Sequence, residues 1–154
     1  MTVFQVLMFC YVLLHFILAG QAVFYKLCFT RVFGEIPGSL FISVRKLADP
    51  ILAKRLALAY YSSLVIGITV VVMAIINGSL AVITLSALAF LMLVADVVLA
   101  RKYNIPLNTQ IRDLSEPTDA ISGHLQYQWL KWIDIRGNFI LAGFVVLIIL
   151  LAFF

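Results

Sequence analysis

Two ionisable side chains lie within stretches of the sequence that are otherwise apolar, and both types can transfer protons. Asp96 is the only acid between residues 56 and 100, and His15 lies near the middle of the apolar stretch 1–25. Ionisable groups are costly inside a bilayer, so each is a functional candidate by default. A membrane-embedded histidine more commonly serves as a packed, hydrogen-bonded group, whereas a lone aspartate is as often functional as it is a snorkelling or ion-paired carboxylate.

Arg136 stands at the start of the last apolar stretch and is the natural partner of Asp96. The segments that carry the two residues follow each other along the chain and must run antiparallel. We therefore predict an Asp96–Arg136 ion pair that forms a structural clamp, a polar site, or both. In a catalytic reading, Asp96 and His15 transfer protons and Arg136 stabilises charge.

Aromatic and amide side chains extend this candidate site. Tyr60 and Tyr61 begin a polar patch at 60–63, for which helix packing is the commoner role and a polar site the alternative. Trp129, Trp132 and Arg136 are spaced i, i+3 and i+7, so they share one helical face. That face could be an ordinary interfacial belt of aromatic residues and a cation. It could instead form the wall of a pocket.

The sequence gives little support for a metal or another cofactor, and we expect none. The only other histidine, His124, is distant from His15 along the chain, and no Cys or carboxylate stands at ligand spacing. Cys10 and Cys28 are 18 positions apart, or roughly 27 Å along one helix. A disulfide needs Cα atoms within about 7 Å, so these cysteines are not expected to pair.

The distribution of charge defines the class of protein. The chain is 64% hydrophobic and 12% charged, and all of its Lys and Arg residues fall between 26 and 55 or between 101 and 136. Soluble domains are about one quarter charged, so we predict an integral membrane protein. Cations that flank membrane spans follow the positive-inside rule and do not indicate a nucleic-acid partner.

The apolar stretches predict four spans, at about 2–25, 52–76, 81–100 and 136–154. Each is long enough to cross a bilayer as a helix, and together they form a single domain, 1–154. We expect an all-α, four-helix transmembrane bundle with both termini outside and the long first and third loops in the cytoplasm. The expected location is the bacterial inner membrane.

Local signals refine this prediction. Asp49-Pro50 is typical of a helix start. Asn77-Gly78-Ser79 predicts a tight turn. The segment Asn104–Asn108 is expected to be extended, because Pro106 disfavours helix in its predecessor. Thr118 follows a second helix-start pattern, and a helix from there could merge with the last span.

The third loop and the start of the last span resemble a four-span family of mostly unknown function that includes the fungal anthrone oxygenases. The resemblance is carried by Asn104, Pro106, Asn108, Trp129 and Arg136, together with the number and length of the spans. Between that Trp and Arg the family often has His or Asn, where this chain has Ile133-Asp134. The resemblance implies a cofactor-independent oxygenase-type enzyme on a flat lipophilic substrate, with Asn104, Asn108, Trp129 and Arg136 lining the site.

The sequence thus leaves two functions open. One is a small enzyme that reaches a lipid or another lipophilic molecule from the cytoplasmic leaflet. The other is a non-catalytic accessory or scaffolding subunit, packed against a membrane-protein partner or another copy of itself. Polar groups in the predicted spans are concentrated in the cytoplasmic half. A channel, which needs a polar path through the whole span, is therefore disfavoured.

Overall fold

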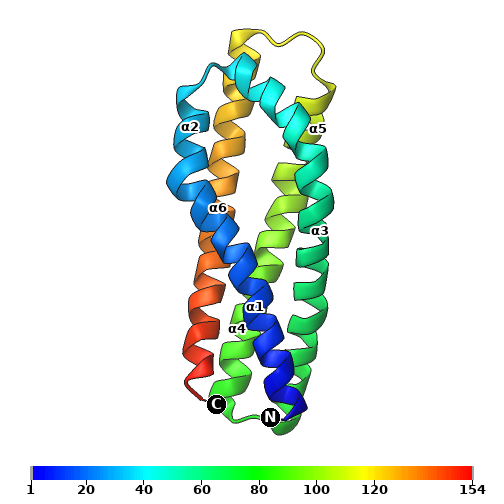
Figure 1. The fold of residues 1–154 in the computed structure, drawn as a ribbon, viewed down its shortest axis with the longest axis vertical. Helices are drawn as coiled ribbons and strands as arrows, with labels where there is room; N and C mark the ends of the chain where they lie inside the picture. The colour runs from blue at the N-terminus through cyan, green and yellow to red at the C-terminus, as the bar shows by residue number, and fades with distance from the viewer. Residues whose placement is uncertain (1, 154) are drawn as a thin grey trace.

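The computed structural model describes residues 2–153 and consists of long helices joined by short connections (Figure 1). Four of its helical columns are long and apolar enough to cross a membrane: Val3–Glu35, Gly38–Asn77, Leu80–Asp113 and Asp119–Leu151. No strand occurs in the described part of the chain. The prediction of an all-α bundle with four candidate spans is confirmed.

Two of the columns each contain one π-helical turn, which is wider than an α-helical turn. The first column is α1 (Val3–Phe24), η1 (Tyr25–Phe29) and α2 (Thr30–Glu35). The third column is α4 (Leu80–Leu99), η2 (Ala100–Asn104) and α5 (Ile105–Asp113). Such turns are rare and occur frequently at functional sites, because they shift the register of the side chains that follow.

Two local predictions were wrong. Residues Asn104–Asn108 are helical rather than extended. In η2 the N–H of Ile105 donates to the Ala100 carbonyl, five residues back. This wider turn directly precedes Pro106, which has no N–H to donate, so the chain can remain helical through the proline.

The predicted helix start at Asp49-Pro50 was also wrong, because both residues lie inside α3 (Gly38–Asn77). The first connection is therefore only Ile36 and Pro37, and the expected long loop is mostly helix. Asp49 serves as an ion-pair partner instead of a cap.

Other local predictions are confirmed. Gly78 and Ser79 alone connect α3 to α4, and the Ser79 hydroxyl caps α4 by accepting from the Val82 N–H. Thr118 caps α6 (Asp119–Leu151) in the same way, and α6 continues without interruption through the last predicted span.

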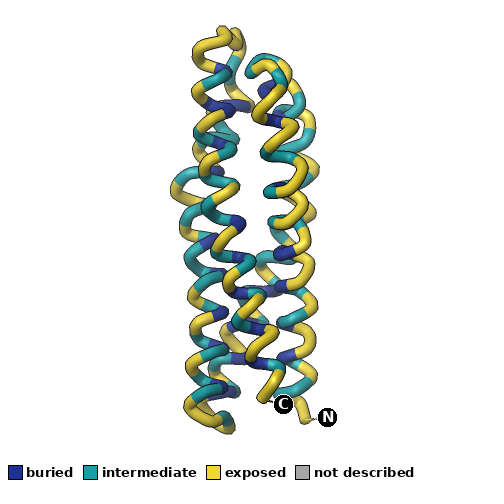
Figure 2. Tube along the Cα trace, turned by 90° about the vertical axis from the view of Figure 1, so that its left-hand side faces the viewer, coloured by how far each residue is buried: buried dark blue, intermediate teal, exposed yellow. Residues whose placement is uncertain are grey.

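The bundle has two unlike halves. The half that holds both termini and the 78–79 connection, here called the terminal half, comprises 2–20, 65–95 and 138–153 and contains no Lys, Arg, Asp or Glu. The other, here called the cationic half, comprises 21–64 and 96–137 and contains all the charged residues. Helices lie close together in the terminal half and spread apart in the cationic half (Figure 2).

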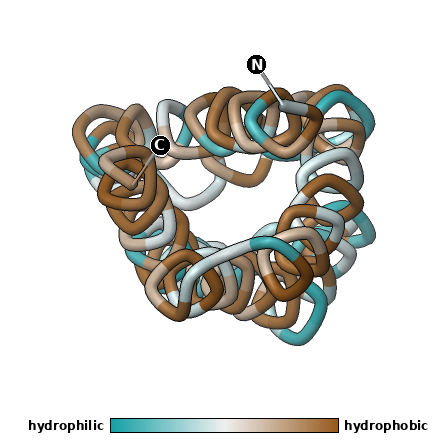
Figure 3. Tube along the Cα trace, turned by 90° about the horizontal axis from the view of Figure 1, so that it is seen from below, coloured by the Kyte–Doolittle hydropathy of each residue, from teal (hydrophilic) through white to brown (hydrophobic). Residues whose placement is uncertain are grey.

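The terminal half is closely packed around an apolar core. That core includes Met8, Val70, Ala89 and Leu147, all essentially inaccessible. Gly67 permits close approach: a Cβ atom there would lie 2.9 Å from Phe90 and from Tyr11. Seen along the bundle axis from this end, the helix traces are mainly hydrophobic (Figure 3).

Candidate functional site

A cavity of about 280 Å³ lies in the cationic half, enclosed by all four helical columns. Leu18, Leu64 and Ile140 line it on the side of the terminal half, and Trp129 lines it on the opposite side. Beyond Trp129 lies a second apolar cluster, which includes Tyr25, Phe33 and Phe41. Trp129 has edge-on contacts with both phenylalanine rings, at centroid distances of 6.0 and 5.6 Å. The aromatic cluster therefore closes the cavity at the end remote from the termini.

The cavity reaches the surface at the side of the bundle. Four of its lining residues are exposed: Ala53 and Tyr61 on α3, Arg101 on η2 and Ile105 on α5. Here η2 packs against α4, α5 and α6, while α3 packs on α4 and on α5. The opening thus lies between α3 and the segment η2–α5.

Arg136 on α6 is fixed by partners from two other columns. Its Nε donates to Asp96 Oδ1 at 2.7 Å and its Nη2 to Asp96 Oδ2 at 3.2 Å, which confirms the predicted ion pair. Nη1 donates to Asn104 Oδ1 at 3.1 Å, and Nη2 also donates to the Tyr60 hydroxyl at 3.3 Å. The two-pronged pair holds the guanidinium plane in one orientation. The Asp96 side chain is 1% exposed, so the carboxylate depends on Arg136 for compensation.

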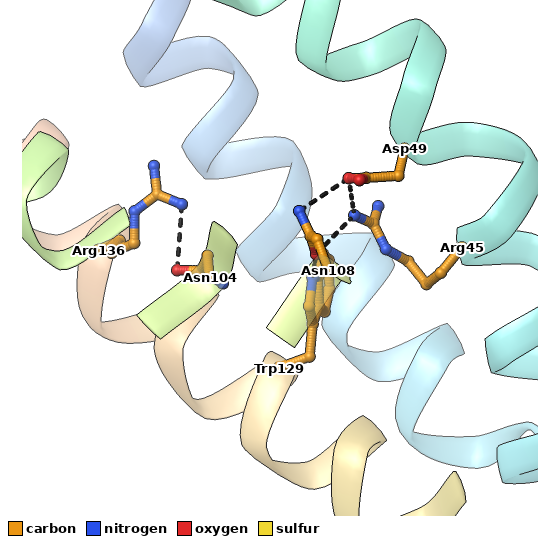
Figure 4. Close-up of polar contacts among 6 residues, drawn as sticks. All are labelled: Arg45, Asp49, Asn104, Asn108, Trp129 and Arg136. Carbon is orange, nitrogen blue, oxygen red and sulfur yellow. Dashed lines mark hydrogen bonds and ion pairs between the residues drawn. The ribbon is translucent and has the colours of Figure 1, made fainter. Parts of the chain in front are cut away.

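A second ion pair, Arg45–Asp49, lies in the same cavity wall (Figure 4). Arg45 Nη2 donates to Asp49 Oδ1 at 2.6 Å. Asn108 connects this pair to Trp129: its amide donates to Asp49 Oδ1 at 2.8 Å, and its oxygen accepts from Trp129 Nε1 at 3.0 Å. The Arg45 guanidinium also lies 4.3 Å from the centre of the Trp129 ring, a cation–π contact. Four side chains from three columns thus hold one another in place.

Two hydrogen-bond donors in this wall have no partner. Asn104 is 3% exposed and Arg45 is 4% exposed, and both line the cavity. Asn104 Nδ2 and Arg45 Nε are buried without a hydrogen bond of normal geometry among the described residues, although the Arg45 guanidinium also interacts with the Tyr25 hydroxyl. Buried donors are normally satisfied, and an unsatisfied one costs about 1–3 kcal/mol. These two N–H groups are therefore positioned to receive acceptors from a bound molecule.

The structure brings most of the predicted site residues together. The cavity is lined by seven of them: Tyr60, Tyr61, Asp96, Asn104, Asn108, Trp129 and Arg136. These residues come from α3, α4, η2, α5 and α6. Because these residues are far apart in the sequence, the packing of the bundle sets the geometry of the site.

Two predicted site residues lie elsewhere. Trp132 stacks on Tyr103, with ring centroids 3.5 Å apart and planes 7° apart, and does not line the cavity. His15 lies in the terminal half, fully buried and edge-on to Tyr11 at 5.6 Å, about one helical turn beyond the cavity residue Leu18. Neither ring nitrogen of His15 has a hydrogen bond of normal geometry. His15 therefore has no direct access to the cavity.

The residues of the cavity wall that sequence reasoning missed include Tyr25, Arg45 and Asp49. Arg45 and Asp49 are spaced i, i+4 and would share a helical face. The i, i+4 spacing was visible in the sequence. Because Asp49-Pro50 was interpreted as a helix start, Arg45 was assigned to a loop and Asp49 to the following helix. Tyr25 is directed by the π turn η1, which the sequence gives no rule to predict.

Among residues 2–153 no three His, Cys, Asp or Glu side chains are grouped as metal ligands. The polar part of the cavity wall instead consists of two ion pairs and hydrogen-bonded amide groups, and the rest of the cavity lining is mainly apolar. Such a surface can bind and orient a molecule that has one polar end.

No family model matches the chain, and no curated protein or solved structure was found to be similar to it.

Proposed function

We propose that the protein is a small membrane enzyme of the cofactor-independent oxygenase type. Its substrate is a small lipophilic molecule that enters from the membrane. The observation that carries this proposal is the apolar cavity whose wall contains two buried, unpartnered N–H donors, on Arg45 and Asn104. A bundle with a purely scaffolding role has no need for such a cavity.

The position of the opening supports entry from the lipid. At about 1.5 Å per residue, the helical stretches of the terminal half measure roughly 20–27 Å. This is close to the hydrocarbon thickness of about 30 Å, so the cavity lies near the membrane interface on the cationic side. Under the positive-inside rule that side is the cytoplasmic one. The lateral opening at Ala53 and Tyr61 would then face the inner leaflet.

The residues that carry the resemblance to the anthrone oxygenase family support the reaction class. Asn104, Asn108, Trp129 and Arg136 all line the cavity. Donors fixed before the substrate arrives, such as Asn104 Nδ2, stabilise negative charge that develops on a substrate oxygen. Asp49 lines the same wall and uses Oδ1 for its bonds with Arg45 and Asn108, whereas Arg136 holds both oxygens of Asp96, so Oδ2 of Asp49 is the carboxylate oxygen better placed to accept a proton.

Binding is tested by filling the cavity. Ala57 lines it, and Ala57→Trp places an indole in the space; Ala81→Trp, in the terminal half of α4, is a control of similar exposure. Native mass spectrometry of the purified proteins is expected to show a lipophilic molecule on the wild type and on Ala81→Trp but not on Ala57→Trp. Equal retention by both variants, or no uptake of any lipophile by the wild type, contradicts the proposal.

Catalysis is tested separately from binding. The recovered molecule is incubated with the wild-type protein under air and under argon, and its mass is followed. Gain of oxygen only under air supports the oxygenase. A molecule that binds but keeps its mass under both gases rejects the enzyme and leaves a binding protein.

A further inference from the structure

The charges in the buried cavity wall cancel in pairs. Arg136 is paired with Asp96, and Arg45 with Asp49, at 2.7 and 2.6 Å. Arg101, the remaining charged lining residue, is exposed at the opening. A carboxylate or phosphate bound at this wall would therefore add an uncompensated negative charge. Burying an unpaired charge is far more costly than burying a hydrogen-bonded neutral group.

The wall nevertheless offers hydrogen bonds. Asn104 Nδ2 and Arg45 Nε are both donors, so the complementary atoms on a ligand are acceptors. The donors lie on different columns, Asn104 on η2 and Arg45 on α3, and Asn108 lies between them in the polar wall (Figure 4). A ligand oxygen can bind Asn104 Nδ2, and a ligand with a second oxygen can also extend toward Arg45 Nε.

The size of the cavity limits the rest of the ligand. A space of about 280 Å³ is just below the range for small-molecule sites, roughly 300–1,000 Å³. It is lined mainly by apolar side chains, among them Leu18, Leu52 and Leu56. A single chain or a small ring system fits this space, whereas a complete two-chain phospholipid does not.

We propose that the cavity selects an uncharged lipophilic molecule whose polar end carries oxygen acceptors, as in a ketone or an ester, and excludes anionic lipids of the same length. The carbonyl oxygen accepts from Asn104 Nδ2, and a second oxygen, where the molecule has one, accepts from Arg45 Nε. This inference rests on the proposed function, namely that the cavity binds a lipophilic molecule.

The experiment compares two probes of equal chain length, 2-dodecanone and dodecanoate. Their affinities are measured for the full-length protein in phosphatidylcholine nanodiscs. The wild type is expected to bind the ketone at least about tenfold more tightly, the equivalent of one charge-assisted hydrogen bond. Asn104→Leu keeps the branched shape but removes the Nδ2 donor, together with the Oδ1 that accepts from Arg136, and is expected to weaken ketone binding by about tenfold. Asn138→Leu, at an exposed position of α6 outside the cavity, is the matched control and should bind as the wild type does.

The charge argument has a test of its own. Asp49→Asn leaves Arg45 uncompensated, so the preference is expected to reverse in favour of dodecanoate. Asp96→Asn does the same for Arg136 and serves as a second variant if Asp49→Asn does not fold, which circular dichroism and size-exclusion chromatography report.

The outcomes separate this inference from the proposed function. If neither probe binds the wild type, or if Ala57→Trp binds them equally well, the cavity is not a ligand site and the proposed function fails. If the wild type binds both probes in the cavity but prefers dodecanoate, this inference alone is overturned. A folded Asp49→Asn or Asp96→Asn protein that keeps the ketone preference overturns it too.

Discussion

The terminal half and the cationic half of the bundle are built from the same four columns but satisfy opposite requirements. In the terminal half, apolar side chains and glycine contacts fill the space between helices. In the cationic half, the helices surround a cavity whose wall contains two ion pairs, and two of the columns carry a π turn there. In lipid, packing and interhelical hydrogen bonds, rather than water exclusion, bring helices together. The comparison shows how one half can supply stability while the other keeps an open site.

The largest expected effect is in the cationic half, at Asp96. Asp96→Asn leaves the largely buried Arg136 cation without its carboxylate, and removing one member of a buried pair costs about 3–5 kcal/mol. The free energy of unfolding in detergent measures this loss. The double variant Asp96→Leu/Arg136→Met should recover much of it. A single variant as stable as the wild type would mean that the pair does not hold the site together.

Side-chain truncation separates the two halves directly. Leu147→Ala, in the filled core, creates an enclosed void and is expected to cost about 2 kcal/mol. Leu56→Ala enlarges a space that already exists and should cost less than about 1 kcal/mol. Thermal unfolding of both variants checks the difference. Equal losses would show that the cavity wall is as closely packed as the core.

The two tryptophans sharpen the comparison within the cationic half. Trp129→Phe removes the hydrogen bond to Asn108 and weakens the contact with Arg45, which together should cost about 1.5 kcal/mol. Trp132→Phe leaves an aromatic ring on Tyr103 and should be nearly neutral. Ligand binding should likewise fall only for Trp129→Phe. The reverse order would place the functional wall at Trp132.

The smallest expected effect concerns glycine in the terminal half. Gly67→Ala forces its new methyl group against Tyr11 and Phe90, for a net loss of about 1 kcal/mol. Gly20→Ala on α1 has no atom within 4 Å and should be neutral or slightly stabilising, since alanine favours helix. Unfolding curves of this matched pair test the close packing of the terminal half. Equal stability of the two variants would contradict it.

Much of the architecture could be predicted from the sequence. Long uncharged stretches dictate helices in lipid, because only a helix satisfies every backbone group there. The turn at Gly78-Ser79 and the cap at Thr118 follow from local side-chain chemistry. Even the Asp96–Arg136 pair could be predicted, because an isolated intramembrane carboxylate requires a cation and the chain order offers Arg136.

Only the tertiary structure decided where the cavity lies and which residues complete it. Local rules treat Pro50 as a helix start and Pro106 as a helix end, yet packing keeps both in helices. That continuity places Arg45 and Asp49 beside Asn108, and the π turn η2 directs Asn104 toward Arg136. Register shifts of this kind depend on contacts between distant segments of the chain. Composition and residue spacing therefore determined the four-helix bundle, whereas tertiary packing determined the position and lining of the cavity.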